Sequence, residues 1–483
     1  MKRWMAAAAA ALCLTALAPG FAMTARADWV EEDGKAHFLD GSGNYVRSDW
    51  RTRDGERYYL DSEGNVAEDT WIQNIYYVGE DGAMLKNAWV EEDGEGGLKD
   101  AGWYYVGQDG KLETNKWKTI GGFRYSFDSD GRMRTGWHYE DGDIYYLGDE
   151  DEGFARSGWQ FLEYSERKRP AEGEISRKLK EGDGRGRWFY FQVNGKAKKS
   201  PAGSYEMETI NDKRYYFDAN GMMCTGWLAV RDQADPEDAA GISRFVYLGG
   251  KDEGVIRRQW LELAEHPWDS DFRSALAVKE ADYDGPEEGE SVRYYFTGDG
   301  TPAFLPKDAA SLKQATVDIE GERYLFDPYG CLQTGLVRVG GETGYFGPEG
   351  GNGIQRIGRV EDMEDRLGRR FTGYFSAAGS DKGVGFTGEK DGFLYWKGLM
   401  VSAKEGTDVQ PFLVDGKVYL VNESGRVQTN EKAYVSDGTY AYRIADGILY
   451  ETDEEGEKTE AVKAGRTLPT AAYAYTYTPK SGA

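Results

Sequence analysis

A short motif of apolar and turn residues recurs along this chain with a period of about twenty residues. An aromatic, aromatic, aliphatic triplet precedes a polar turn that closes on Gly, and an aliphatic residue and then Trp follow. The motif reads RYYLDSEGNVAEDTW from Arg57 to Trp71, IYYVGEDGAMLKNAW from Ile75 to Trp89 and RYSFDSDGRMRTGW from Arg124 to Trp137. Self-similarity at this period is typical of stacked supersecondary units, so the pattern predicts a repeat architecture.

Each unit reads as one β-hairpin. Tyr-Tyr-aliphatic runs favour strands, and turn pairs such as Asp81-Gly82 and Asp130-Gly131 suit a tight turn with positive φ. We expect the aliphatic residue after the Gly, such as Met84, to begin the return strand. An isolated hairpin is marginally stable, so successive hairpins must stack. The predicted fold class is therefore all-β, a repetitive β-hairpin solenoid with polar loop insertions.

The first residues differ from the repeats. Lys2 and Arg3 precede an apolar run from Met5 to Leu17, and Ala25-Arg26-Ala27 offers small residues to a signal peptidase. Residues 1–27 are therefore predicted to be a secretory signal peptide. The apolar run is shorter than the ~20 residues that span a bilayer, and no later segment is apolar enough, so we expect no membrane span.

The remaining chain divides by how well the repeat is kept. We expect hairpin repeats over 28–263 with insertions near 165–187 and 231–243, a polar insertion over 264–290, degenerate hairpin repeats over 291–450 and a flexible tail over 451–483. The insertions are expected to project as loops from one edge of the solenoid, either as tolerated surface segments or as partner sites.

The charge and cysteine content exclude some classes of function and a disulfide. The chain has 59 Lys and Arg against 84 Asp and Glu, and loss of Lys2, Arg3 and Arg26 with the signal would take the net charge from −25 to −28. Such a surface repels nucleic acid and anionic membrane. Cys224 and Cys331 lie several repeats apart, so we expect isolated apolar residues and no disulfide.

No constellation of catalytic residues is apparent. His37, His138 and His266 are dispersed, and neither a G-x-S-x-G nor an HExxH motif occurs. Pairs of acids are expected by chance in so acidic a chain, and the turn at Asp128 lacks the downstream bidentate Glu of a calcium loop. We therefore predict a protein that is not an enzyme, with no cofactor, catalytic residue or metal site.

The GW steps at Gly136-Trp137, Gly158-Trp159 and Gly226-Trp227 complete a recognisable pattern. With the WYY triplet and Gly turn, it resembles the choline-binding and cell-wall-binding repeats of Gram-positive surface proteins, which are related to glucan-binding and clostridial-toxin repeats. The resemblance covers about residues 29–260 and then thins. It implies a left-handed solenoid in which about three aromatics hold a quaternary ammonium by cation–π attraction.

In that resemblance a cage takes the Trp of the GW step, the first aromatic of the triplet and a Tyr of the next hairpin. The alternative interpretation is that each such Trp serves mainly as a hydrophobic staple between hairpins. Trp103 keeps the family's first aromatic. The candidate ligand-binding residues are Trp89, Trp103, Tyr105, Trp117, Tyr125, Trp137, Tyr146, Trp159, Trp188 and Trp227.

Most triplets depart from the family at their first position. Arginine stands there at Arg57, Arg124, Arg214, Arg293 and Arg323. Three interpretations remain open: an ion pair with a nearby carboxylate, stacking of the guanidinium on the neighbouring Trp in place of choline, or binding of an external anion.

The sequence thus predicts a secreted, non-catalytic and cell-wall-associated protein. Its partner would be a cell-wall polymer, whether teichoic acid, a choline-like group or a glycan, bound at several weak sites that compound through avidity. The alternative is a structural spacer or adhesin whose insertions bind a host or bacterial surface protein and whose repeats bind little ligand.

Overall fold

A computed structural model describes residues 26–95, 98–163, 186–267, 285–287 and 289–477. The predicted signal peptide, most of the 165–187 insertion, much of the 264–290 insertion and the last residues of the predicted tail lie outside the described residues. The chain forms two compact units, Met1–Lys198 and Lys199–Ala483. The regular secondary structure of both units consists almost entirely of antiparallel β-strands, as predicted.

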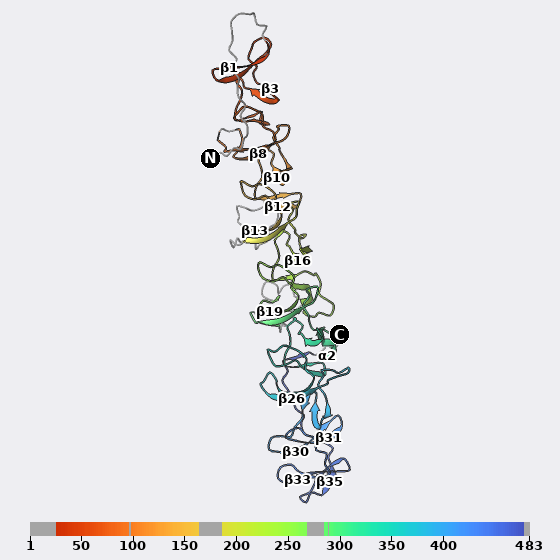
Figure 1. The fold of residues 1–483 in the computed structure, drawn as a ribbon. Helices are drawn as coiled ribbons and strands as arrows, with labels where there is room; N and C mark the ends of the chain where they lie inside the picture. The colour runs from red at the N-terminus through yellow and green to blue at the C-terminus, as the bar shows by residue number, and fades with distance from the viewer. Residues whose placement is uncertain (1–25, 96–97, 164–185, 268–284, 288, 478–483) are drawn as a thin grey trace. The chain divides into compact units, whose positions relative to one another are not determined.

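The first unit is a succession of two-stranded hairpins in chain order (Figure 1). Its pairs are β1 (Asp28–Glu32) with β2 (Lys35–Leu39), β3 (Asp49–Arg53) with β4 (Glu56–Leu60), β5 (Thr70–Ile72) with β6 (Tyr76–Val78), β7 (Ala88–Glu92) with β8 (Gly102–Val106), β9 (Lys116–Ile120) with β10 (Phe123–Phe127), β11 (Trp137–Glu140) with β12 (Asp143–Tyr146), and β13 (Gly158–Glu163) with β14 (Gly186–Phe191).

The hairpins form, but their pairing differs from the prediction. Each Trp-bearing strand pairs with the triplet that follows it, so that Trp89 lies opposite Tyr105. The expected turn at Asp130-Gly131 instead joins two hairpins, and there Phe127 and Met133 form only a single bridge. The physical reason is cross-strand packing, because the Trp strand offers the triplet a large ring that the short return segment lacks.

Successive hairpins are joined by one repeated backbone hydrogen bond. The N–H of the return residue donates to the carbonyl of the first triplet residue in the preceding hairpin. The pairs are Met84 to Arg57 at 2.8 Å, Leu112 to Ile75 at 2.7 Å, Met133 to Trp103 at 2.7 Å, Ala155 to Arg124 at 2.8 Å, Ile256 to Arg214 at 3.0 Å and Leu332 to Arg293 at 2.8 Å. The bond uses backbone atoms only, so the side chain at the first triplet position is free to vary.

The turn glycines allow close packing at the same junction, because side chains of the preceding repeat lie against them. Gly131 has a φ of +86°, and a Cβ there would lie 2.6 Å from Leu112 of the preceding repeat. Gly153 has a φ of +62°, and its Cβ would lie 2.2 Å from Met133. Small apolar clusters fill the junctions, as where Trp71 and Tyr77 pack on Tyr104 of the next hairpin. The core is therefore shared between neighbouring hairpins.

The second unit begins with hairpins and ends in larger sheets (Figure 1). Its two-stranded hairpins are β15 (Met207–Ile210) with β16 (Lys213–Tyr216), β17 (Trp227–Ala229) with β18 (Phe245–Tyr247), β19 (Gln259–Leu263) with β20 (Val292–Phe296), β21 (Thr316–Ile319) with β22 (Glu322–Leu325), and β30 (Val409–Val414) with β31 (Lys417–Asn422). A three-stranded sheet contains β24 (Glu342–Tyr345), β23 (Leu336–Val339) and β36 (Tyr475–Tyr477). A five-stranded sheet has the order β25 (Gly358–Glu364), β26 (Arg370–Phe375), β29 (Leu399–Met400), β28 (Phe393–Trp396) and β27 (Gly388–Lys390), and a four-stranded sheet has the order β32 (Ala433–Val435), β33 (Tyr440–Ala445), β34 (Ile448–Thr452) and β35 (Lys458–Ala461). Two short helical turns, Ile242–Arg244 and α2 (Leu312–Ala315), accompany them.

The insertion at 231–243 is largely exposed over its first residues, but its last residues pack into the core. Ala240 and Ile242 are buried in an apolar cluster with Trp227. Asp238 is also buried and accepts hydrogen bonds from the backbone N–H groups of Ala240, Gly241 and Ser243. The polar residues that suggested a surface loop therefore close a turn that inserts two apolar side chains into the core.

The chain end also differs from the expected flexible tail. Residues 462–477, which we call the strap, run back along the second unit and end in β36, parallel to β23. Arg466 N–H donates to Pro411 O at 2.8 Å, and Ala472 N–H donates to Asp365 Oδ2 at 2.8 Å. Val462, Leu468 and Tyr473 each pack against a different apolar cluster. The strap is therefore attached to the second unit at several points, which its Ala, Thr and Tyr-rich composition does not indicate.

Asp365 is the buried anchor of the strap. Its carboxylate also accepts hydrogen bonds from the N–H groups of Leu367 and Arg369 and from the Arg369 side chain. Burial alone would raise the pKa of Asp365, but the hydrogen bonds from Ala472 and Arg369 outweigh it and lower the pKa to about 2. The folded pKa is depressed, so this stabilisation is present above the usual Asp pKa and is lost as pH falls towards 2.

Replacing Gly131 with Ala tests the junction. We expect Gly131→Ala to lower the free energy of unfolding of the first unit by roughly 2–4 kcal/mol, because a strained φ adds to overpacking against Leu112. Gly142→Ala is the matched control: its φ is +79°, but no atom lies within 4 Å of the added Cβ, so only about 1 kcal/mol should be lost. Urea unfolding measures both, and equal losses would contradict the junction's role.

Removing the carboxylate of Asp365 tests the strap. Asp365→Ala should speed hydrogen exchange at Arg466, Ala472 and Ala474, because the strap loses its charged acceptor. Asp453→Ala is the control, since Asp453 closes a similar turn through the N–H groups of Glu455 and Glu457. Exchange in the wild-type strap should also rise as pH falls from about 4 towards 2, after correction for intrinsic exchange. Unchanged protection in Asp365→Ala would contradict this anchor.

Candidate functional site

The candidate site repeats between neighbouring hairpins. In each hairpin with a Trp, the first triplet residue is the diagonal cross-strand neighbour of that Trp. Trp89 lies opposite Tyr105, and Trp103 is two residues before Tyr105 on the same face. A Tyr or Phe of the next hairpin closes the third side. We call this group of Trp, diagonal residue and following ring a cage.

Arginine occupies the diagonal position of three cages. The guanidinium carbon of Arg57 lies 4.7 Å from the Trp50 ring centroid, that of Arg124 4.1 Å from Trp117, and that of Arg293 5.0 Å from Trp260. Each Trp also contacts a Tyr of the next hairpin, at 5.4 Å for Tyr76, 4.8 Å for Tyr145 and 4.8 Å for Tyr324. In these cages a protein cation already occupies the aromatic surface.

The ion-pair interpretation of the arginines receives no support from the described contacts. None of the five forms a salt bridge with a carboxylate in the described part of the chain. Arg124 instead donates to the backbone oxygen of Asn194 at 2.5 Å. Arg214 and Arg323 face no Trp, because Met207 and Thr316 stand at the Trp position of their hairpins. The structure therefore favours stacking for Arg57, Arg124 and Arg293.

A lysine fills a further cage that the sequence does not reveal. Lys99 Nζ lies 5.4 Å from the Trp71 ring centroid and 5.6 Å from that of Tyr104. The diagonal residue there is Ile75, which supplies no cation. Lys99 lies in the lengthened segment between β7 and β8. The length of this segment is the one feature of the sequence that indicates an unusual cage here.

The cage of Trp89, Trp103 and Tyr125 has aromatic rings on all three sides. Trp89 lies 6.4 Å from Trp103 and 4.9 Å from Tyr125, with interplanar angles of 87° and 66°. All three rings are half-buried, and burial raises the pKa of Tyr125. Among the described residues, no Lys or Arg side chain lies over any of these three rings. In this cage, which we call the open cage, unlike those of Trp50, Trp117 and Trp260, the described residues place no protein cation on the aromatic surface.

Acidic side chains surround one wall of the open cage. Trp103 lines a surface hollow of about 660 Å³ together with Glu91, Glu92, Asp128, Glu150 and Asp151. Two arginines, Arg132 and Arg134, also line it, and Arg132 pairs with Asp128 at 3.6 Å. The excess of carboxylates makes the approach to Trp103 more favourable for a cation than for an anion.

The remaining candidate aromatics divide into cage walls and core. Trp137 packs on Phe189 of the next hairpin at 4.8 Å, with Ile144 at its diagonal position. Trp159 and Trp188 form a two-ring diagonal pair at 6.3 Å. Tyr105, Tyr146 and Trp227 are buried, at 6%, 9% and 5% exposure, and act as core. Sequence reasoning did not name Tyr145, Tyr76 or Tyr324, although each second triplet position predicts such a ring.

Two of the three histidines are held by hydrogen bonds. His37 Nδ1 lies 2.9 Å from Gly64 O, and His266 is hydrogen-bonded to Tyr294 Oη and Glu290 O. Burial, aided by Arg134, lowers the pKa of His138. Cys224 and Cys331 are free thiols, and burial raises the pKa of Cys224 to about 12. Across the described ranges, no group of His, Cys, Asp or Glu has the arrangement of a metal site.

Family comparisons identify the repeats. Two families, both described as "Choline-binding repeat", match at residues 44–82 and 65–112 and at residues 114–159. A third, described as "Putative cell wall binding repeat", matches residues 208–223. A comparison with curated proteins finds no match.

Similar solved structures come from Streptococcus pneumoniae. The modular autolysin LytC is 18% identical with a TM-score of 0.35, and the match covers 63% of this chain and 53% of LytC. CbpJ is 18% identical with a TM-score of 0.34, covering 71% of this chain and 100% of CbpJ. Choline binding protein F, in the presence of a peptidoglycan analogue, is 19% identical with a TM-score of 0.34, covering 71% and 98%. This chain therefore spans about half the length of LytC.

No helix in the described part of the chain has the length and apolar character needed to cross a bilayer. The matched residues include the Trp89, Trp103 and Tyr125 cage and the arginine-filled cage of Trp117. The resemblance predicted from the sequence is confirmed: residues 44–112 and 114–159 match the choline-binding repeat families, and residues 208–223 match the "Putative cell wall binding repeat" family.

Proposed function

We propose that this protein is a secreted, non-catalytic, cell-wall-associated protein that binds a choline-like quaternary ammonium of a wall polymer. The observation that carries the proposal is the open cage of Trp89, Trp103 and Tyr125, which has three aromatic walls and no described protein cation over them. The matching repeats are of the choline-binding type in the same residues.

Physical chemistry favours a quaternary ammonium at this site. A fully methylated cation cannot donate hydrogen bonds, so aromatic faces hold it, at about 0.5–2 kcal/mol per contact. The carboxylates beside Trp103 add long-range attraction for positive charge. A neutral sugar could donate hydrogen bonds to those carboxylates but would gain no long-range attraction from their charge. Choline carried on a wall polymer therefore suits the site better than an uncharged glycan does.

The filled cages support a second function as well. Arg57, Arg124 and Arg293 act as internal ligands that join neighbouring hairpins without any external partner. A chain whose repeats act mainly through such filled cages would serve chiefly as a spacer or adhesin. The two functions differ in a measurable way, because only the first requires wall binding that choline displaces.

Removing one wall of the open cage tests the proposal. Trp103→Ala should abolish choline-dependent binding to choline-bearing cell walls, with at least a tenfold loss of affinity for choline, because an aromatic wall is lost. Trp117→Ala is the matched control, since Arg124 already fills that cage and no choline site should be lost. Sedimentation with purified walls and choline as competitor measures both. Equal binding by wild type and Trp103→Ala would contradict the proposal, and wild-type binding that choline does not displace would favour the second function.

Converting a filled cage into an open one tests the same idea by gain of function. Arg124→Trp, made in the Trp103→Ala protein, should create a choline site between Trp117 and Tyr145. Choline at about 100 times its Kd would then stabilise the protein by about 2.7 kcal/mol. Arg214→Trp is the control, because Met207 stands where a Trp would complete that cage. Thermal melting with and without choline detects the gain, and no gain with Arg124→Trp would contradict the role of the diagonal residue.

A further inference from the structure

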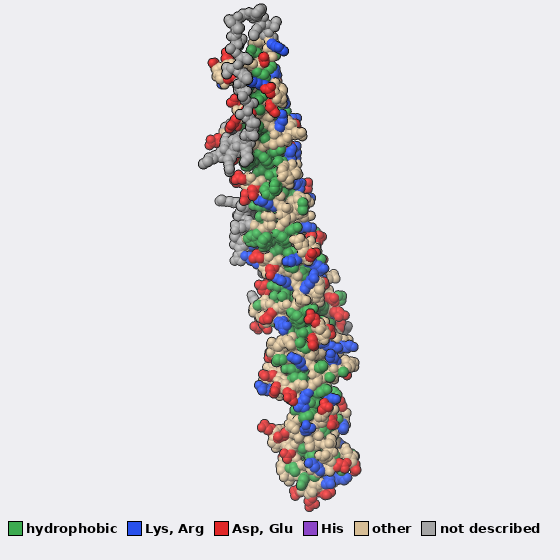
Figure 2. All heavy atoms as spheres, viewed as in Figure 1, with side chains coloured by type: hydrophobic (Ala, Val, Ile, Leu, Met, Phe, Trp, Pro, Cys, Tyr) green, Lys and Arg blue, Asp and Glu red, His purple; other side chains and the backbone are tan. Residues whose placement is uncertain are grey.

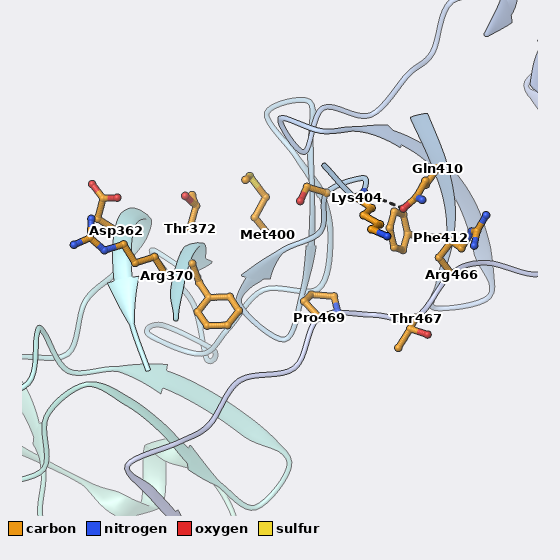
Figure 3. Close-up of a pocket in the computed structure, with 12 residues that line it drawn as sticks. Asp362, Arg370, Thr372, Met400, Lys404, Gln410, Phe412, Arg466, Thr467 and Pro469 are labelled. Carbon is orange, nitrogen blue, oxygen red and sulfur yellow. Dashed lines mark hydrogen bonds between the residues drawn. The ribbon is translucent and has the colours of Figure 1, made fainter. Parts of the chain in front are cut away.

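The second unit contains a surface groove unlike the rest of this acidic chain. It measures about 630 Å³ and lies between β26, the segment after β29, β30 and the strap (Figure 3). Its charged lining residues are Arg370, Lys404 and Arg466 against a single acid, Asp362. The whole chain has 84 acids and 59 basic residues, so this local excess of positive charge reverses the overall sign.

The positive charge of the groove is not fully neutralised. None of Arg370, Lys404 and Arg466 forms a salt bridge with a carboxylate in the described ranges. Figure 3 shows Arg370 beside Asp362 at one end of the groove and Lys404 and Arg466 near Phe412 at the other. Elsewhere on the face in Figure 2, basic and acidic side chains are interspersed. The end with Lys404 and Arg466 therefore carries the excess positive charge, while Asp362 offsets the charge of Arg370 at the other end.

The backbone holds these cations in place. Arg466 lies on the strap, whose N–H bond to Pro411 O sets the position of this residue on β30. The preceding Gly465 allows close approach, because a Cβ there would lie 2.2 Å from the backbone nitrogen of Leu413. Lys404 N–H donates to Oε1 of the buried Gln410 at 3.0 Å. Arg370 extends from β26, so separate elements supply the three charges.

The uncharged lining points to a polyhydroxylated ligand. Thr372, Ser402, Gln410 and Thr467 can exchange hydrogen bonds with hydroxyl groups, and Phe371, Met400 and Pro469 offer apolar surface. Arginine forks hold phosphate or carboxylate bidentately, and lysine contributes a point charge. An oxyanion attached to a sugar or polyol satisfies both parts of this lining.

We propose that this groove binds the phosphate or carboxylate groups of an anionic polyol or sugar chain, at a site separate from the choline cage. The two sites read opposite charges, because the cage in the first unit accepts a cation and the groove accepts an anion. The groove's function does not rest on the cage, and each can fail without the other.

The test compares oligomers that differ only in charge. A glycerol phosphate oligomer and a galacturonate oligomer represent the two sources of oxyanion, and a galactose oligomer is the neutral control. Isothermal titration calorimetry of the full chain should detect binding of at least one anionic oligomer and none of the neutral one, with an affinity that falls as salt rises. Binding of neither anionic oligomer, or equal binding of the neutral one, would overturn the proposal.

Charge variants then locate the binding. The triple variant Arg370→Gln, Lys404→Gln and Arg466→Gln should lose at least about tenfold in affinity, because charge-assisted hydrogen bonds are lost. Lys390→Gln, an exposed residue of β27 outside the groove, should bind as wild type. Trp103→Ala should also retain anion binding, which separates the groove from the cage. Wild-type affinity in the triple variant would contradict the site.

A variant that is expected to bind more tightly provides a further test, because a gain of affinity cannot result from misfolding. Asp362 has a φ of +55° at the bulge of β25 and is the one acid of the groove. Asn tolerates this backbone conformation, so Asp362→Asn removes the repelling charge with little strain. Its affinity for the anionic oligomer should rise several-fold, since misfolding cannot strengthen binding. Unchanged or weaker binding by this variant, if it melts as wild type, would overturn the proposal.

Discussion

A hairpin of two short strands cannot bury its own aromatic face, and that constraint shapes the repeats of this chain. Each Trp therefore packs against its own triplet and against a ring of the next hairpin, as Trp89 does with Tyr105 and Tyr125. The inter-hairpin hydrogen bond and the turn glycine hold the two hairpins at the distance this packing needs. Stability and the candidate ligand sites thus depend on the same junction.

Because the junction uses only backbone atoms at the first triplet position, that side chain can change the chemistry without changing the fold. Trp103 at this position adds a third ring to its cage, whereas Arg124 brings its own cation to the same place. The proposed choline site therefore depends on which residue stands at this position of the Trp89 cage. Lys99 achieves the same filling from a longer spacer.

The repeat, the all-β fold class and the resemblance to choline-binding repeats could be predicted from the sequence, because turn glycines and closing tryptophans are local signals. It did not determine which strands pair, since Asp-Gly turns occur both within hairpins and between them, as at Asp141-Gly142 and Asp130-Gly131. The strap was missed because its anchors, such as Ala472 on Asp365, are 107 residues apart in sequence. Arginine stacking was one of three interpretations, because sequence alone does not show which ring a guanidinium meets.

The most direct test of the central claim is a crystal structure of this protein grown or soaked with choline. The account predicts an ammonium group among Trp89, Trp103 and Tyr125, while the guanidinium groups of Arg57, Arg124 and Arg293 remain over their tryptophans. Choline bound over Trp117 with Arg124 displaced, or no choline at Trp89, would contradict the claim that the diagonal residue decides which cages are open.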